Sequence, residues 1–159
     1  MADGVFNISK GRVVEYYLRV DVSDPTNAVF EIFLMKATEA DATLIIRTDV
    51  ADIFAEGGNT EADFLNYASK ILSDAELAAL PAPDQTNDRY EVDIPDQTWS
   101  AAGNATNNTL TKFLTTYDSD STGGTDANTL PMTHHDFAVT TDGSDLTAQI
   151  NALGFFRAA

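Results

Sequence analysis

Val29-Phe30-Glu31-Ile32-Phe33-Leu34-Met35 is the longest apolar run in the sequence, and only Glu31 interrupts it. β-Branched and aromatic side chains dominate the run, which is typical of a β-strand. It is far shorter than the roughly 20 apolar residues that a membrane-spanning helix needs. Residues 13–20 upstream have a similar composition, and Asp24-Pro25-Thr26-Asn27 between the two runs is typical of a turn. We therefore predict two neighbouring strands.

A short helical region is predicted next. Residues 49–56 fit a helix that Thr48 caps and Gly57-Gly58 ends, and Ser73-Asp74-Ala75-Glu76 has the capping-box pattern of another helical turn. The intervening segment 61–72 is ambiguous, because its apolar residues fit helical spacing while alternate residues also fit a strand. Periodicity slightly favours the helix.

From residue 90 onward the signals are those of β-structure. We predict strands at 90–94, 98–99, 109–117, 130–140, 146–150 and 155–157, with Thr141-Asp142-Gly143-Ser144 joining the fourth to the fifth. The sequence thus predicts a mainly β fold: a single-domain antiparallel β-sandwich or barrel over residues 13–159, with one or two short helices. Residues 1–12 are expected to form an N-terminal arm that becomes ordered on a partner.

Composition removes several classes of function. The 159 residues include no cysteine, so thiolate zinc sites, disulfides and thiol nucleophiles are impossible. A net charge of −16, from 25 acidic and 9 basic residues, repels nucleic acid and anionic membrane surfaces. The first residues show no basic and apolar pattern of a secretory signal, so we expect synthesis in the cytoplasm without export.

One acidic loop has part of a calcium-binding pattern. Asp118, Asp120 and Asp126 lie in a stretch that contains Gly123-Gly124, and oxygen ligands followed by glycine are typical of calcium turns. The bidentate Glu that an EF-hand has at position twelve is replaced by Thr129. An ordinary polar turn is therefore the favoured interpretation, and no metal or other cofactor is predicted.

His134-His135-Asp136 raises the question of a metal or catalytic site. Neighbouring residues of a strand point to opposite faces, so the two histidines are not expected to share a metal, whereas His134 and Asp136 can share a face. The chain has no third histidine, no G-x-S-x-G elbow, no P-loop and no G-x-G-x-x-G. A structural role for the histidines is favoured, and no catalytic residue is predicted.

Four stretches of the sequence carry a resemblance to a family. They are 4–12 (GVFNISKGR), 66–70 (NYASK), 96–103 (DQTWSAAG) and 133–145 (THHDFAVTTDGSD). The chain resembles small virion structural proteins of tailed phages, notably phages that infect actinobacteria, over nearly its whole length. The resemblance implies no catalytic residues. It also implies a strand around residues 66–70, in place of the helix that periodicity slightly favours.

The resemblance implies a capsid decoration protein as the leading interpretation. Such a protein is made in the host bacterial cytoplasm, binds the major capsid protein on the outside of the mature head and self-associates, typically as a homotrimer. A high net charge keeps such a protein soluble until expansion of the shell creates its binding site on the capsid. The expected capsid-binding residues are Val5, Phe6, Ile8, Lys10 and Arg12.

Two other functions stay open. The first is a tail or head-fibre module that binds a host-surface glycan through exposed aromatic rings, for which Trp99, Tyr16, Tyr17 and Tyr67 are candidates. The second is a hydrolase that uses an acid pair or a His134/Asp136 site, and it is the least favoured because no nucleophile, base and orienting group can be assembled from local motifs.

Overall fold

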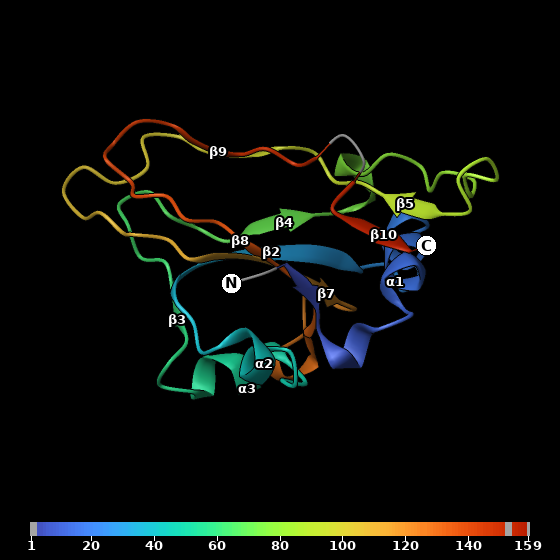
Figure 1. Cartoon of the computed structure of the whole chain (residues 1–159), viewed down its shortest axis with the longest axis horizontal. Helices are drawn as coiled ribbons and strands as arrows, with labels where there is room; N and C mark the ends of the chain where they lie inside the picture. The colour runs from blue at the N-terminus through green and yellow to red at the C-terminus, as the bar shows by residue number, and fades with distance from the viewer. Residues whose placement is uncertain (1–2, 152–153, 159) are drawn as a thin grey trace.

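The computed structural model describes residues 3–151 and 154–158. Its centre is a six-stranded antiparallel sheet formed by β1 (Gly4–Val5), β2 (Val29–Ala37), β3 (Thr60–Glu61), β4 (Lys70–Leu72), β7 (Lys112–Asp118) and β8 (Leu130–Asp136). The strand order is β1-β8-β7-β2-β3, and β4 pairs with another part of β2. Figure 1 shows β4 beside β2. The longest strand, β2, therefore lies inside the sheet.

Both faces of this sheet are covered, which explains the nearly continuous apolar run of β2. Phe30, Ile32 and Leu34 belong to one buried cluster, whereas Phe33 and Met35 belong to a second. Successive side chains of a strand point to opposite faces, so a strand buried on both sides needs apolar residues at nearly every position.

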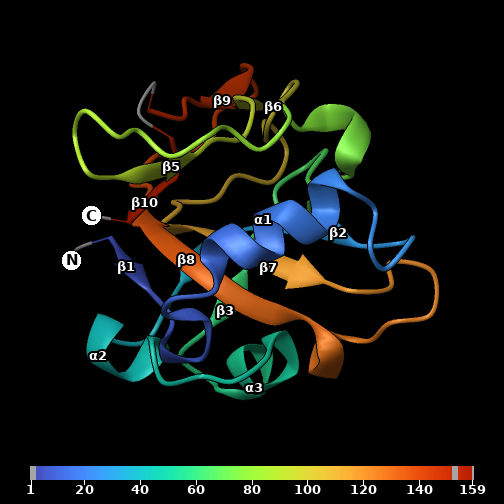
Figure 2. The same ribbon diagram turned by 90° about the vertical axis from the view of Figure 1, so that its right-hand side faces the viewer.

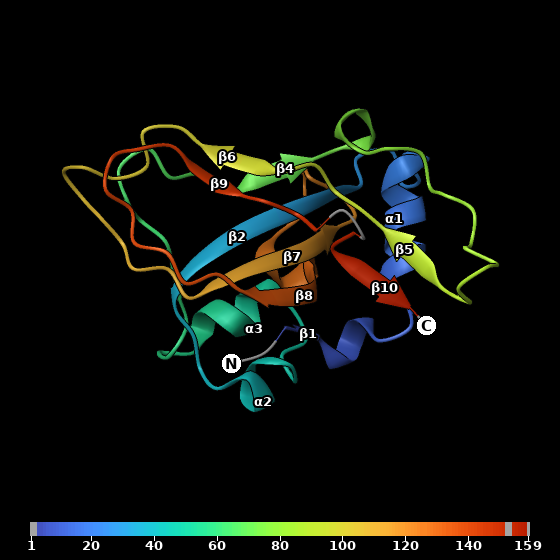
Figure 3. The ribbon, with the colours of Figure 1, turned by 45° about the horizontal axis from the view of Figure 1, so that its top comes forward.

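Two small β-ribbons and a helix cover the first face. The ribbons pair β5 (Tyr90–Val92) with β10 (Phe156–Ala158), and β6 (Gln97–Trp99) with β9 (Leu146–Ala148). Helix α1 (Val13–Asp21) crosses beside them, as Figure 2 shows. The second face is covered by α2 (Asp41–Leu44), α3 (Val50–Ala55) and the 3-10 turn η1 (Asn7–Ser9), and Figure 3 shows the helices and the ribbons on opposite sides of the sheet.

The prediction of a mainly β, antiparallel single domain with short helices is confirmed. The remaining short elements are the 3-10 turns η2 (Asp74–Glu76) and η3 (Asp126–Asn128). In the described part of the chain, no helix combines the length and the apolar character that crossing a bilayer requires.

Residues 13–20, predicted as a strand, form helix α1 instead. Val13, Tyr16, Tyr17 and Val20 are its buried residues, and their spacing of three, four and seven is that of one helical face. On the exposed side, Glu15 pairs with Arg19 one turn later at 2.8 Å. The strand prediction was wrong because it weighted β-branched and aromatic composition above this periodicity.

The segment 61–72 is neither a continuous helix nor a continuous strand. β3 ends at Glu61 and β4 begins at Lys70, and Asn66 between them has a positive φ of 72°. Such a backbone conformation belongs to neither regular element. The expected strand near 66–70 is therefore confined to its last residue, which opens β4.

The predicted helix near residue 50 is confirmed as α3, with a different cap. The carboxylate of Asp49 accepts a hydrogen bond of 2.7 Å from the amide of Asp52, so Asp49 rather than Thr48 is the capping residue. The capping box between Ser73 and Glu76 is also present, at the start of η2.

The turn at 141–144 lies between β8 and β9, which do not pair with each other. β8 pairs with β1 and β7 in the central sheet, whereas β9 pairs with β6 in a ribbon on one face. The turn instead crosses between layers, held where the amide of Thr141 donates to the carbonyl of Asn108.

The N-terminal segment is packed on the domain and is not a separate arm. Gly4 and Val5 pair with His134 and Thr133 of β8, and the amide of Phe6 donates to the carbonyl of Met132 at 3.0 Å. The Phe6 side chain is fully buried in the second cluster. The expected boundary at residue 12 is therefore absent from the described structure, because an apolar side chain near the terminus completes the core.

Candidate functional site

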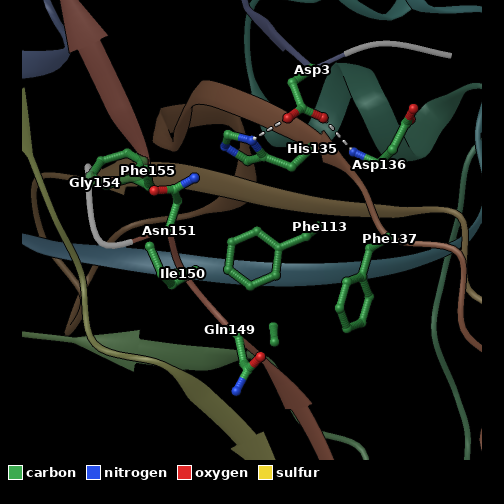
Figure 4. Close-up of a pocket in the computed structure, with 11 residues that line it drawn as sticks. Asp3, Phe113, His135, Asp136, Phe137, Gln149, Ile150, Asn151, Gly154 and Phe155 are labelled. Atoms are coloured by element: carbon green, nitrogen blue, oxygen red, sulfur yellow. Dashed lines mark hydrogen bonds and ion pairs between the residues drawn. The ribbon is translucent and has the colours of Figure 1, made fainter.

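A groove of about 320 Å³ lies where β7, β8, the segment after β9 and Asp3 meet (Figure 4). Apolar side chains of Phe113, Phe137, Ile150 and Phe155 line part of it. The polar side chains that line it are those of Asp3, His135, Asp136, Gln149 and Asn151. An apolar surface ringed by a few polar groups is the usual form of a small-molecule site.

Asp3 ties the N-terminal segment to this groove. One carboxylate oxygen accepts a hydrogen bond of 2.8 Å from the amide of Asp136, and the other lies 3.5 Å from Nδ1 of His135 (Figure 4). Burial lowers the pKa of His135, and the Asp3 carboxylate opposes that shift. Asp3 therefore acts as a polar clamp between the start of the chain and the end of β8.

From His135, further hydrogen bonds lead into the central sheet. Nε2 of His135 lies 2.8 Å from the hydroxyl of Thr133, which in turn lies 2.6 Å from the hydroxyl of Thr115. The order carboxylate, imidazole, hydroxyl resembles that of a hydrolytic triad. However, the Thr133 side chain is buried, so its oxygen does not face the groove. This chain of contacts joins Asp3 to β8 and β7, and it presents no nucleophile to a substrate.

A buried lysine contacts Asp136, one of the residues that line the groove. Lys112 is 0% exposed, and its Nζ contacts carboxylate oxygens of Asp136 at 2.6 Å and Asp41 at 2.9 Å. Burial alone would lower the pKa of Lys112, but the two carboxylates together outweigh burial and raise it. The ammonium therefore stays charged and joins α2 to two strands. The sequence offered no local signal for this cluster, because its members are far apart in the chain.

His134 and His135 point to opposite faces of β8, as the strand geometry predicted. The ring of His134 packs edge-on against Phe6 on the second face, with a centroid separation of 5.6 Å. Asp136 bonds to Lys112 rather than to His134. No group of three histidine or acidic residues among the described residues is arranged to hold a metal ion.

The five expected capsid-binding residues divide into two groups. Phe6 is buried and Val5 is half-buried, whereas Ile8, Lys10 and Arg12 are exposed. Arg12 directly precedes α1, pairs with Glu15 of that helix at 3.3 Å and lies 4.8 Å from the centre of the Tyr16 ring.

An exposed residue that sequence reasoning missed lies in the segment beside them. The amide of Asn7 donates to the carbonyl of Ile45 at 2.8 Å, which brings η1 against the end of α2. The next residue, Ile46, is 58% exposed. Ile8, Lys10 and Ile46, here called the N-terminal face, combine two exposed apolar side chains with a basic one.

In the acidic loop at residues 118–126, the carboxylates of Asp118 and Asp120 accept hydrogen bonds from within the loop. An Asp118 oxygen accepts from the amide of Asp120, and Asp120 accepts from Asn27, Thr122 and Gly123. These hydrogen bonds, above all that from the Thr122 hydroxyl, lower the pKa of Asp120. Asp126 opens η3 and is exposed. The geometry is that of a polar turn, stabilised by side-chain to backbone bonds.

The aromatic residues expected to stack on a glycan are not available for it. Tyr16, Tyr17 and Trp99 are at most 2% exposed, and Nε1 of Trp99 donates to the carbonyl of Ala68. Tyr67 is half-buried, and its hydroxyl contacts both Glu61 and the amide of Leu34. The prediction of exposed platforms at these positions is wrong, because the rings build the core.

The sequence matches no family model, and no curated protein and no solved structure matches the chain.

Proposed function

We propose that this protein is a non-enzymatic virion structural protein of a tailed phage, which binds the outside of the mature capsid as a decoration protein. The stretches around residues 4–12, 66–70, 96–103 and 133–145, which resemble such proteins, support the proposal. The proposed partners are the major capsid protein and further copies of this chain, as a homotrimer. The proposed location is the capsid surface.

The observation that carries the docking part of the proposal is the N-terminal face. Ile8 and Ile46 are exposed apolar side chains on two segments joined by a hydrogen bond, and Lys10 lies beside them in a chain of net charge −16. Within the described residues Lys10 makes no ion pair, so its ammonium is available to an acidic group on a partner. An apolar centre with a polar rim is typical of protein–protein interfaces.

The overall charge supports the same role in a second way. A decoration protein accumulates to high concentration before expanded heads offer a site, and a strongly acidic surface keeps copies apart in that period.

The test is co-sedimentation with expanded heads assembled without this protein. Deleting residues 1–11 is a poor probe, because it removes the buried Phe6 along with the exposed residues. A sharper probe is the pair Ile8→Glu and Ile46→Glu, with Ile71→Glu as the matched control, because Ile71 is as exposed as Ile46 but lies on β4.

We expect saturable binding of the parent protein and of Ile71→Glu, and at least a tenfold weaker affinity for each of the other two variants. Such a loss corresponds to about 1.4 kcal/mol or more, the range of a central interface residue. Equal binding by all three variants would exclude the N-terminal face as the docking surface. No binding of the parent protein would exclude decoration altogether.

A second candidate function is glycan binding by a tail or head-fibre module. The groove of Figure 4 favours it, because a half-buried Phe137 lies among amide and carboxylate side chains that can hydrogen-bond to sugar hydroxyls. Binding of host-surface polysaccharide that Phe137→Ala abolishes, together with no binding to heads, would establish this function instead.

A further inference from the structure

The imidazole of His134 is buried without a hydrogen-bond partner. The residue is 1% exposed, and within the described part of the chain neither Nδ1 nor Nε2 is bonded. Buried polar side chains nearly always have a partner, so an exception in a small domain calls for a physical reason. It also means that, if both ring nitrogens carried a proton, no described group would accept a hydrogen bond from either of them.

The N-terminal segment forms the cover over this ring. Gly4 lies directly opposite His134 in the β1–β8 pairing, and a Cβ added to Gly4 would come within 2.5 Å of Nε2. Phe6 contacts the same ring edge-on. The backbone of Gly4 therefore covers Nε2 of His134, beside a shallow pocket that Lys10 and Asp41 also line. Detaching the segment from β8 would hydrate the ring.

The acidic groups around the ring already contact other polar groups. The titratable and charged groups that face it from the neighbouring elements are Lys112 of β7, Asp41 of α2, His135 and Asp136 of β8, and Asp3 and Lys10 at either end of the N-terminal segment. Asp41 and Asp136 hold the Lys112 ammonium, and Asp3 holds His135 and the amide of Asp136. A proton on His134 in the closed structure would thus add a second buried cation near Lys112.

We propose that His134 is a proton-sensitive latch, whose protonation releases residues 3–9 from the edge of β8 while the rest of the domain stays folded. The closed state needs a neutral imidazole under Gly4 and Phe6. The open state places the ring in water, where its positive charge is solvated. Acidification therefore shifts the population toward the open state.

The direction and size of the effect follow from linkage. Burial, and after it the charge of Lys112, lowers the pKa of His134 in the closed state, whereas a hydrated imidazole has a pKa of about 6.5. The latch is fully closed above that pH and weakens as the pH falls below it. Between pH 7.5 and pH 5.5 the opening equilibrium should rise about tenfold, for one proton taken up only by the open state.

His135 is expected to respond differently. Its side chain is 26% exposed, and its Nδ1 faces the Asp3 carboxylate, which opposes the lowering of its pKa by burial. Release of the segment removes that carboxylate, so release does not favour a proton on His135 as it does on His134. Release would also move Ile8 and Lys10, so acidification would weaken binding to the capsid through the N-terminal face. This consequence rests on the proposed function, whereas the latch itself does not.

The test is amide hydrogen exchange by NMR on the full chain at pH 7.5 and pH 5.5, with rates corrected for the intrinsic pH dependence. The reporters are the amides of Phe6 and Asn7, which donate to Met132 and to Ile45, and the reference amides lie in the β2–β7 pairing. We expect the protection of the reporters to fall about tenfold at pH 5.5 and to stay below that of the reference amides at both pH values.

His134→Leu and His134→Gln both remove the titratable imidazole at position 134. The pH response of the reporter amides is compared with that of the parent protein in whichever variant keeps the reference amides protected. The tenfold change should vanish in these variants and persist in His135→Gln. The latch is refuted if the pH response survives in the His134 variants, or if reporters and reference amides exchange at the same rate, which would mean that the segment opens only with the whole domain.

Discussion

Replacing Phe6 with Ala tests whether the N-terminal segment belongs to the core. The Phe6 ring is 0% exposed and packs in the second cluster, whose other members include Leu44, Val50, Ile53 and Leu114. Removing a fully buried phenylalanine side chain costs about 3–5 kcal/mol, because transfer free energy is lost and a cavity remains. Domains of this size have a total stability of about 5–15 kcal/mol, so the variant should lose a large part of it.

The assay is equilibrium urea unfolding followed by tryptophan fluorescence, which reports on the buried Trp99. The matched control is Ile8→Ala, two residues away and exposed, for which we expect a change within about 0.5 kcal/mol. A Phe6→Ala loss below about 1 kcal/mol would refute the packing described for residues 3–9 and would restore the view of this segment as a free arm.

Three further changes probe other parts of the structure, each measured by the same unfolding assay. Lys112→Met should destabilise the domain by about 3 kcal/mol, because two carboxylates are left facing each other beside a buried site; an unchanged stability would show that the ion cluster contributes nothing. Asp49→Ala should cost about 1 kcal/mol and Thr48→Ala clearly less, since Asp49 caps α3; the reverse order would contradict the assigned cap. Glu31→Gln should stabilise the domain at pH 7 by less than about 1 kcal/mol, because burial raises the pKa of Glu31 and its charged form is disfavoured. Since the folded pKa is raised, that gain should shrink as the pH falls toward 4, and a gain independent of pH would contradict this explanation.

Strands were predictable where the local pattern and the tertiary environment agree. β2 and β7 are dense in apolar and β-branched residues because both of their faces are buried, so composition alone identified them. Helix α1 has the same composition but a helical spacing of buried residues, and only the spacing distinguishes it from a strand. Weighing periodicity first would have found this helix.

The candidate sites depend on contacts between distant parts of the chain, which no local pattern encodes. Phe6 bonds to the backbone of Met132, and Lys112 meets carboxylates from α2 and β8. Near the N-terminus, an apolar residue that fills the core and one that anchors a partner look the same in sequence. The opposite directions of His134 and His135 were predictable, because they follow from strand geometry alone.

The most direct test of capsid decoration is electron cryo-microscopy of expanded heads saturated with the purified protein. We expect added density on the outer surface at repeated symmetry-related sites, into which the domain fits with η1 and the end of α2 against the shell. No added density on the heads, or added density only at the tail, would show that this protein does not decorate the capsid.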